Sequence, residues 1–306
     1  MDKTKMHHHA YLIMAHNNWN QLKMLLELLD DSRNDIFIHI DKHAGDFPEE
    51  SLRAAVKYSN LVFISRKNIY WADFSQTDVE LDLLEAASRN SHYHYYHLLS
   101  GGCLPLKTQD YIHRFFENEN REFVATVRSG GEYSRKYIAY YHWLLHNSFY
   151  RKCKALKMLD RLLMYAQKLI GIDRLRGTGI VAATGWTWFS ITDDFCRHLV
   201  NNRQLIKKLF IHTVASDEHI MGTIAVNSEF VDRIYDINDE YKNDYCEGCM
   251  RYIDWERGKP YVWGTENTEQ DYKLLKNSKY LFARKFDERV NPEIIQRIYN
   301  DLKSNR

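Results

Sequence analysis

The sequence has only four prolines and five cysteines in 306 residues, and its net charge is +1. So little proline argues against a disordered chain. A charge so close to zero excludes a global field that would draw the protein to nucleic acid. No apolar run is long enough to span a membrane, and no signal peptide precedes the first apolar segment. The odd, scattered cysteines predict free thiols in a reducing compartment, so we expect a cytoplasmic protein.

Several catalytic and metal-binding motifs are also missing. There is no GxSxG elbow, Walker loop or GxGxxG fingerprint, which sets aside three large enzyme classes. There is no Asp-x-Asp, the motif with which many nucleotide-sugar transferases hold a divalent ion, and the CxxC of Cys246 and Cys249 has no second pair. We therefore expect no metal. A metal-dependent enzyme using the histidines is a competing hypothesis; these fall at His7–His9, at His39 and His43, and at His92, His94 and His97.

Apolar and amphipathic segments alternate through the first half of the chain. Short apolar runs are typical of strands buried on both faces, and the segments between them carry apolar residues at helical spacing. This alternation predicts an α/β fold with a mainly parallel sheet flanked by helices. The expected strands are 8–15, 35–40, 61–65 and 95–99. One helix is expected to start after Asn17 or Asn18, and two further helices are expected over 51–58 and 77–87.

Polar or glycine-rich residues follow three of these strands, at 41–43, 65–71 and 100–105. Ligands of parallel sheets bind at the carboxyl ends of the strands. These segments are therefore expected to surround one mouth, where a nucleotide would lie.

The second half is less regular. We expect a strand over 123–127, a polar loop over 128–136 and a basic amphipathic helix over 151–176, whose apolar side carries Leu156, Leu159, Leu163 and Ile170. A solvated basic face is one interpretation of that helix, and peripheral contact with anionic lipid is the other. One domain over 1–306 is expected, with a nucleotide-binding half at about 8–125, an acceptor and catalytic half at about 126–290, and a last helix over 291–306.

Residues 185–218 combine aromatic and acidic side chains. Aromatics around a turn form a flat wall on which a sugar can stack, and we favour Trp186 for that wall because it departs from the apolar alternation. Trp188 and Phe189 fit a pocket and a core equally well. Asp217 and Glu218 stand at the head of an apolar helix, where an acid can accept a proton or merely favour the helix dipole. Further on, Arg284 and Lys285 could neutralise a leaving diphosphate or form an ordinary basic surface pair.

Six short runs occur in a fixed order. They are Ile38-His39-Ile40-Asp41-Lys42, Val62–Arg66 with Tyr70-Trp71-Ala72, Tyr96–Gly101 with Leu104–Thr108, Gly185-x-x-Trp188-Phe189 before Ile191-Thr192, Ser216-Asp217-Glu218, and Leu281–Asp287. Over about residues 8–290 this order resembles the core-2/I-branching β-1,6-N-acetylglucosaminyltransferase family, which also contains peptide O-xylosyltransferases, and here suggests a bacterial member.

The resemblance implies a GT-A-type fold and inverting transfer from a UDP-sugar without a metal. The family's catalytic glutamate, in a Ser-Pro-Asp-Glu segment, falls on Glu218, although this chain has Ala215-Ser216 where the family has Ser-Pro. A solvated glutamate with a pKa of about 4.3 would be ionised at neutral pH. The family's diphosphate-contacting lysine falls on Lys285.

The remaining site residues divide between donor and acceptor. On the donor side the expected residues are Asp41, Arg66, Ser100, Gly101, Arg284 and one of Arg257 and Lys259; on the acceptor side they are Trp186, Trp255, Asp217, Glu132, Arg135 and Tyr137.

The expected partners are a UDP-sugar and an oligosaccharide or lipid-linked glycan, with no cofactor and no nucleic acid. UDP-GlcNAc is the first donor and UDP-xylose the second. The expected setting is cytoplasmic polysaccharide synthesis, with peripheral contact at the inner face of the membrane. A non-catalytic nucleotide-sugar- or glycan-binding protein on the same fold is the rival hypothesis.

Overall fold

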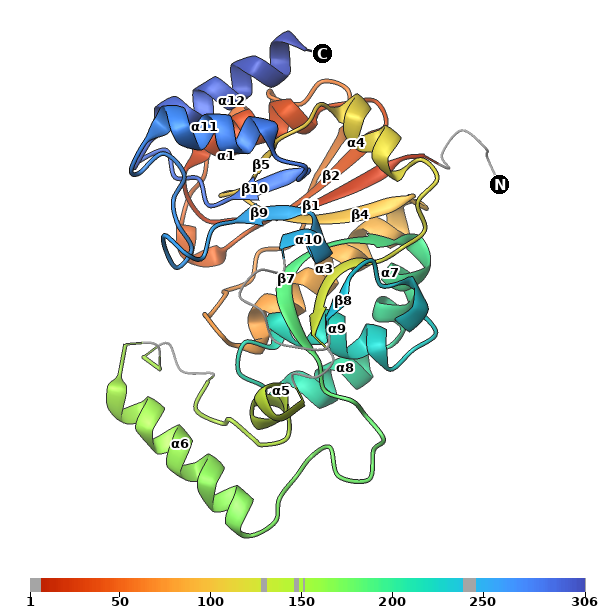
Figure 1. Cartoon of the computed structure of the whole chain (residues 1–306), viewed down its shortest axis with the longest axis vertical. Helices are drawn as coiled ribbons and strands as arrows, with labels where there is room; N and C mark the ends of the chain where they lie inside the picture. The colour runs from red at the N-terminus through yellow and green to blue at the C-terminus, as the bar shows by residue number, and fades with distance from the viewer. Residues whose placement is uncertain (1–6, 128–130, 146–148, 151, 239–245, 306) are drawn as a thin grey trace.

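The computed structural model shows a seven-stranded sheet, a three-stranded sheet and helices on both sides of them (Figure 1). It describes residues 7–127, 131–145, 149–150, 152–238 and 246–305, without the side chains of residues 131–133 and 238. The strand order of the large sheet is β3-β2-β1-β4-β7-β6-β8. The predicted α/β class with a mainly parallel central sheet is confirmed, and it is the architecture expected of a GT-A-type enzyme.

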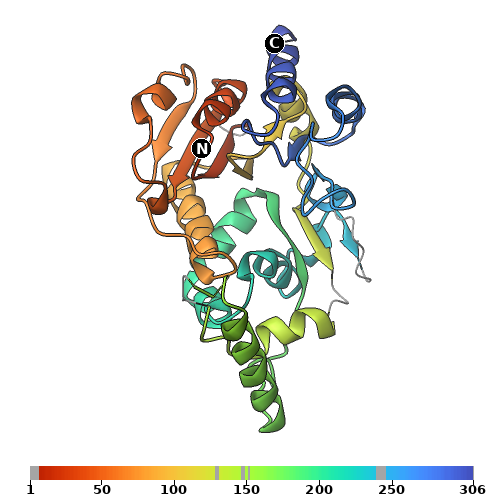
Figure 2. The ribbon, with the colours of Figure 1, turned by 90° about the vertical axis from the view of Figure 1, so that its left-hand side faces the viewer.

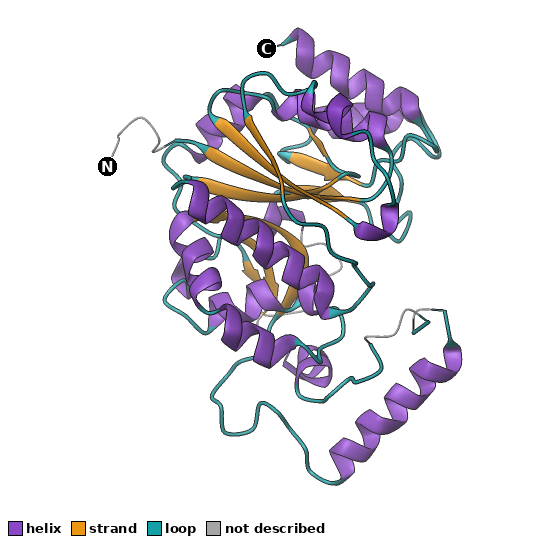
Figure 3. Cartoon of the chain, turned by 180° about the vertical axis from the view of Figure 1, so that it is seen from behind, coloured by secondary structure: helices purple, strands orange, loops and turns teal. Residues whose placement is uncertain are grey.

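Four parallel strands form the first half of the large sheet: β1 (His9–Ala15), β2 (Asn34–Ile40), β3 (Asn60–Phe63) and β4 (Tyr95–Ser100). β1 lies between β2 and β4, and its side chains are almost entirely buried, as a continuous apolar run predicts. The helices α1 (Trp19–Leu29), α2 (Glu49–Arg53) and α3 (Phe74–Asn90) connect these strands. Figures 1 and 3 show α1 and α3 on opposite sides of the sheet.

The second half of the sheet contains antiparallel pairs. β7 (Thr184–Thr192) runs antiparallel to β4 and to β6 (Phe123–Val127), and β6 runs parallel to β8 (Ile237–Asn238). The expected aromatic turn at 185–189 was wrong, because these residues lie within β7. Gly185 allows a bulge there: a Cβ on it would lie 1.6 Å from the Ala125 carbonyl oxygen.

The three-stranded sheet has the order β5-β10-β9, with β5 (Leu104–Pro105), β9 (Arg251–Ile253) and β10 (Phe282–Arg284). Arg251 is fully buried and joins the two sheets: its guanidinium donates to the Ser190 hydroxyl at 2.8 Å and the Leu98 carbonyl at 3.3 Å. α11 (Thr268–Asn277) and α12 (Pro292–Ser304) pack against each other, and α12 packs against α1 (Figure 2). This arrangement carries the end of β10 to the end of β1.

The other helices are α4 (Gln109–Phe116), α5 (Gly131–Ile138), α6 (Lys154–Leu169), α7 (Asp193–Asn201), α8 (Arg203–Phe210), α9 (Ile220–Val226) and α10 (Cys246–Cys249). The prediction of a polar loop over 128–136 was wrong for the described part of this segment, because the helix α5 begins at Gly131. α2 starts and ends earlier than predicted, and α6 is shorter. Within the described chain, no helix combines the length and apolar character that crossing a bilayer requires.

Two of the histidines considered as metal ligands, His9 and His97, lie together with His113 in the core. His9 and His97 are fully buried, with a nitrogen–nitrogen distance of 3.1 Å, and His113 stacks on His9 at 4.0 Å between ring centroids. Burial lowers the pKa of His97 and of His9 well below the usual value, so both rings are neutral at pH 7. These rings fill space among Tyr95, Phe116 and each other, which argues against a catalytic metal held by this group.

Candidate active site

The donor side of the site is built from the ends of β1, β2 and β4. Asp41 follows β2, and its carboxylate accepts from the backbone N–H of His43 at 2.9 Å and of Ile69 at 3.3 Å. Arg66 donates to the carbonyls of Asp41 at 2.9 Å and Gly45 at 2.7 Å. The structure therefore brings Asp41 and Arg66 together, with Arg66 bracing the turn that presents Asp41.

The end of β4 lies directly against the residues after β10. The Phe286 N–H donates to the Gly102 carbonyl at 2.9 Å. Gln21 donates to the carbonyls of Gly101 at 2.7 Å and Phe286 at 3.2 Å. Ser100, Gly101 and Lys285 are thus neighbours in space, as the resemblance implied. Sequence reasoning missed Gln21; its signal was a polar residue on the apolar side of α1, where it is fully buried.

Lys285 is half-buried and forms no ion pair with the described residues. Its charge acts on His16, which follows β1: burial lowers the pKa of His16, Asp41 opposes this, and Lys285 and Arg289 add to it. His16, Asp41 and Lys285 therefore share one neighbourhood. A cation whose charge is not already neutralised there can meet a phosphate group. His16 is a further site residue that the sequence reasoning did not single out.

The other cations proposed for the donor side differ in whether neighbouring side chains already bind their charge. Arg257 forms ion pairs with Asp254 at 2.6 Å and Asp271 at 2.8 Å. Lys259 is exposed and has no ion pair with the described residues. Arg284 stacks over the Trp188 ring at 4.1 Å, and Trp188 itself is buried. Between the two alternatives for the second diphosphate cation, Lys259 retains the more available charge.

The two acids lie in η3, a 3₁₀ turn over Ser216–Glu218 that α3 and β7 hold in place. The Asp217 carboxylate accepts from Gln76 at 2.7 Å and from the Thr187 hydroxyl at 2.6 Å. Ser216 stands where the family has proline, and its hydroxyl lies 2.8 Å from that of Thr77. Asp217 is buried and its hydrogen bonds are internal, so in this structure it holds the turn instead of facing an acceptor.

Glu218, unlike Asp217, is exposed to solvent. The protein around it desolvates its carboxylate and, together with the charge of Asp217, raises the pKa of Glu218 to about 8. Glu218 is thus open to solvent, as expected, but its pKa lies above the ordinary value of about 4.3. Burial also raises the pKa of Asp217, which hydrogen bonding by Thr187 and the charge of Arg284 partly counteract. A carboxylate with a pKa near the working pH is well matched to general-base catalysis.

Catalytic efficiency should consequently depend on pH. Below about pH 8 Glu218 increasingly keeps its proton and cannot accept another, so kcat/KM is expected to rise from pH 5 to pH 8 and level off above it. The measurement is kcat/KM for donor and acceptor across this range, with Glu218→Gln as the control whose residual rate should lack this rise. A wild-type profile that is flat from pH 5 to 9 would contradict the base assignment.

Aromatic side chains gather next to η3. Trp186 and Trp255 meet edge to face, with their ring centroids 4.8 Å apart, and Trp255 is 41% exposed. Tyr137 lies beside His219, the residue after Glu218, at 5.6 Å between ring centroids. Two of the acceptor candidates therefore contact each other, and the third lies beside the end of η3. Trp188 and Phe189, by contrast, are buried.

The other acceptor candidates are less informative. Arg135, on α5, forms an ion pair with Asp173, so its charge is already satisfied. The side chain of Glu132 lies outside the described residues. Neither residue adds to the site as the structure shows it.

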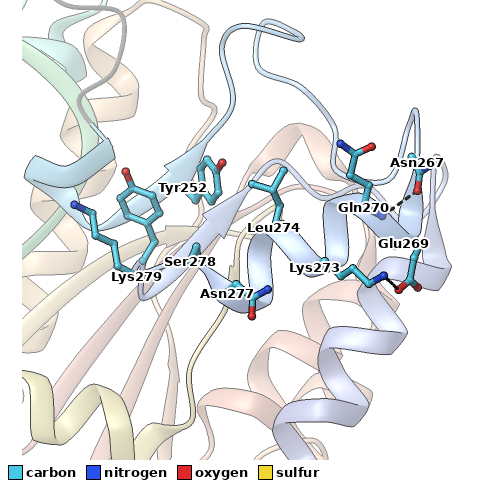
Figure 4. Close-up of a pocket in the computed structure, with 10 residues that line it drawn as sticks. Tyr252, Asn267, Glu269, Gln270, Lys273, Leu274, Asn277, Ser278 and Lys279 are labelled. Carbon is cyan, nitrogen blue, oxygen red and sulfur yellow. Dashed lines mark hydrogen bonds and ion pairs between the residues drawn. The ribbon is translucent and has the colours of Figure 1, made fainter.

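A hollow of about 780 Å³ lies elsewhere, beside α11 and β9 (Figure 4). Its lining includes Tyr252, Leu274 and Tyr280 but none of the candidate residues. Its two lysines are paired, Lys273 with Glu269 at 3.0 Å and Lys279 with Glu247. With these charges neutralised, the hollow offers no diphosphate site, and the chemistry is better placed at η3 and the strand ends.

Comparison with known proteins identifies similar sequences. A family model described as Core-2/I-Branching enzyme matches residues 9–276. Xylosyltransferase 2 of Rattus norvegicus and of Homo sapiens are each 25% identical over 308 residues, and Xylosyltransferase 1 of Rattus norvegicus is 23% identical over 316. These alignments cover 94%, 94% and 97% of this chain but 33%, 33% and 35% of the relatives. The chain therefore spans about a third of their length.

Solved structures give a weaker likeness. The apo form of mouse xyloside xylosyltransferase 1 is 10% identical with a TM-score of 0.37, covering 90% of this chain and 96% of the other. The apo form of the glycosyltransferase GlyE of Streptococcus pneumoniae TIGR4 is 10% identical with a TM-score of 0.40, covering 97% and 64% respectively.

Proposed function

The chain belongs to the core-2/I-branching enzyme family, and from this premise we propose that it is an inverting glycosyltransferase that uses a UDP-sugar donor without a metal. The observation that carries the proposal is that the end of β10 links two groups of candidates: the residues after β10 contact the Ser100–Gly102 turn, and the charge of Arg284 acts on Asp217, the neighbour of Glu218 in η3. Together they offer a base, backbone groups and a cation to a single bound substrate.

The proposed reaction is a single displacement. Glu218 accepts the proton of an acceptor hydroxyl, whose oxygen forms a bond to the anomeric carbon. The bond from that carbon to the diphosphate breaks, and UDP leaves from the opposite face with both electrons. Lys285 and a second cation, Lys259 or Arg257, stabilise the negative charge that develops on the diphosphate. The lack of an Asp-x-Asp motif supports side-chain cations in the role a metal often has.

The donor sugar is GlcNAc or xylose. The sequence resemblance supports GlcNAc, whereas the names of the curated relatives support xylose. The proposed acceptor is an oligosaccharide or a lipid-linked glycan of a bacterial polysaccharide pathway, reached in the cytoplasm with contact at the inner face of the membrane.

A donor screen tests the function. Thermal unfolding and UDP-sugar hydrolysis are measured with UDP-GlcNAc, UDP-xylose and other UDP-sugars, in EDTA, on wild type and Glu218→Gln. One UDP-sugar should stabilise both proteins, and only wild type should turn it over. If EDTA abolishes turnover, the metal-independent mechanism fails. If a UDP-sugar binds without turnover in wild type, even with glycan acceptors, the protein is a binding protein on this fold.

The edge-to-face tryptophan pair predicts an effect on acceptor binding. Trp255→Ala should raise the acceptor KM about tenfold, because the exposed ring and its contact with Trp186 are lost. Donor hydrolysis without acceptor should stay within about twofold of wild type. Trp143→Ala, which removes another exposed tryptophan distant in sequence from this pair, is the matched control. An unchanged acceptor KM in Trp255→Ala would remove the pair from the acceptor site.

A further inference from the structure

The most deeply buried residues of α6 are polar. Asp160 and Gln167 are both buried, at 4% and 3% exposure, and lie two turns apart on one side of α6. Asp160 accepts from His142 at 2.7 Å, and Gln167 bonds to the backbone N–H and carbonyl of Tyr141 at 2.8 and 2.9 Å. Figure 1 shows α6 standing apart from the sheets and their flanking helices. These polar contacts hold α6 in place together with three half-buried apolar residues on the same side, Leu156, Leu163 and Met164.

The side opposite these contacts is apolar and open. Met158, Leu162, Tyr165 and Leu169 are 65%, 56%, 59% and 87% exposed, and their spacing of four, three and four residues places them along one side of the helix. Of the four residues that the sequence analysis placed on one apolar side, Leu156 and Leu163 are half-buried, whereas Leu159 and Ile170 are exposed. A contiguous apolar face on a soluble protein marks an interaction surface.

A row of cations borders this face. Lys154, Lys157, Arg161 and Lys168 follow one another along one flank of α6. Asp160, the only acidic residue of the helix, is buried on the other side. The surface therefore combines exposed apolar side chains with positive charge and has no acidic residue of its own, which is the composition of helices that lie in a membrane interface.

We propose that the exposed face of α6 docks onto an anionic lipid surface, with Met158, Leu162, Tyr165 and Leu169 entering the interface and the cation row contacting lipid phosphates. A second copy of α6 fits poorly, since it would bring a second basic row and no exposed acid. The inference rests on the membrane contact included in the proposed function. It adds which side of the protein makes that contact, the exposed face of α6, and that the lipids carry negative charge. Lipid binding is measured without any sugar, so either proposal can fail while the other stands.

The test is binding of the full chain to sedimented vesicles. The wild type should bind vesicles of phosphatidylglycerol and phosphatidylcholine and should bind pure phosphatidylcholine vesicles far more weakly, with binding that weakens at high salt. Met158→Ser/Leu162→Ser should lower the affinity at least about tenfold. Lys154→Gln/Lys168→Gln should lower it roughly thirtyfold, because two surface cations are removed.

Matched controls keep the changes away from α6. Leu205→Ser/Leu274→Ser removes two exposed leucines on α8 and α11, and Lys57→Gln/Arg114→Gln removes two positive charges elsewhere. Both control variants should bind vesicles like wild type, and every variant should unfold at the same temperature as wild type. Three outcomes would overturn the proposal: equal binding to neutral vesicles, α6 variants that bind like wild type, or a dimer in solution that only the α6 variants disrupt.

Discussion

Replacing Glu218 by Gln is expected to lower turnover by roughly 10²–10⁴-fold while the donor binds almost as in wild type. Glutamine keeps the size of the side chain but cannot accept the acceptor proton. Glu218 is exposed beside the buried Asp217, and its carboxylate forms no hydrogen bond with the described residues, so the exchange should leave η3 intact. The measurement is steady-state kcat with the donor and acceptor found by the screen, together with the donor dissociation constant.

The matched control is Glu229→Gln, because the Glu229 side chain is 74% exposed and its nearest basic partner, His198, is 3.8 Å away. That variant should keep wild-type turnover. A Glu218→Gln enzyme with more than about a tenth of the wild-type kcat would assign the base to another group. A variant that also loses donor binding would show that Glu218 contacts the donor.

Lys285→Gln is expected to lower kcat by about 10²–10³-fold, equivalent to the 2.7–4 kcal/mol lost when one donor is removed from an oxyanion hole. The reason is that Lys285 lies against the Ser100–Gly102 turn without an ionic partner among the described residues, so its charge is available to the departing diphosphate. The side chain is half-buried, and glutamine preserves most of its apolar stem. Turnover and donor KM are measured separately.

The separation of kcat from KM decides the role. A change in kcat and kcat/KM alike indicates stabilisation in the transition state, whereas a higher KM with unchanged kcat means that Lys285 only binds the ground state and the leaving-group assignment is wrong. Lys273→Gln, on the surface of α11 and paired with Glu269, is the control and should behave as wild type. Lys259→Gln and Arg257→Gln in the same assay identify the second cation; the ion pairs of Arg257 favour Lys259.

Most of the parallel sheet could be predicted from the sequence. β1, β2, β4 and β6 begin and end within one residue of the predicted strands, because strands buried on both faces leave continuous apolar runs. The errors fall where local pattern and tertiary contact disagree. Residues 185–189 contain glycine and aromatics and so suggest a turn, yet pairing with β6 makes them part of a strand. α5 lies in a polar stretch with no apolar periodicity to reveal it.

The candidate site could be predicted in pieces. The runs containing Asp41, Ser100, Glu218 and Lys285 were each recognisable in the linear sequence, and the structure brings those of Asp41, Ser100 and Lys285 together. What orients them is harder to recognise: Gln21, Gln76 and Thr187 are distant in sequence from the groups they hold, and only Gln21 carries a local signal, as a polar residue on the apolar side of α1. Arg257 and Lys259 were equal candidates in the linear sequence, and the ion pairs of Arg257 in the structure make it the weaker one.

By itself the sequence determined the fold class, the family and the order of the motifs, because these depend on residue type and on spacing along the chain. Only the tertiary structure decided which charges are neutralised, that Asp217 faces inward while Glu218 stays open to solvent, and that α6 presents its apolar side outward. An amphipathic helix has the same periodicity whichever side it packs, and the sequence does not distinguish a buried carboxylate from an exposed one. Solvation and pairing are properties of the surroundings, which residues far apart in the sequence supply.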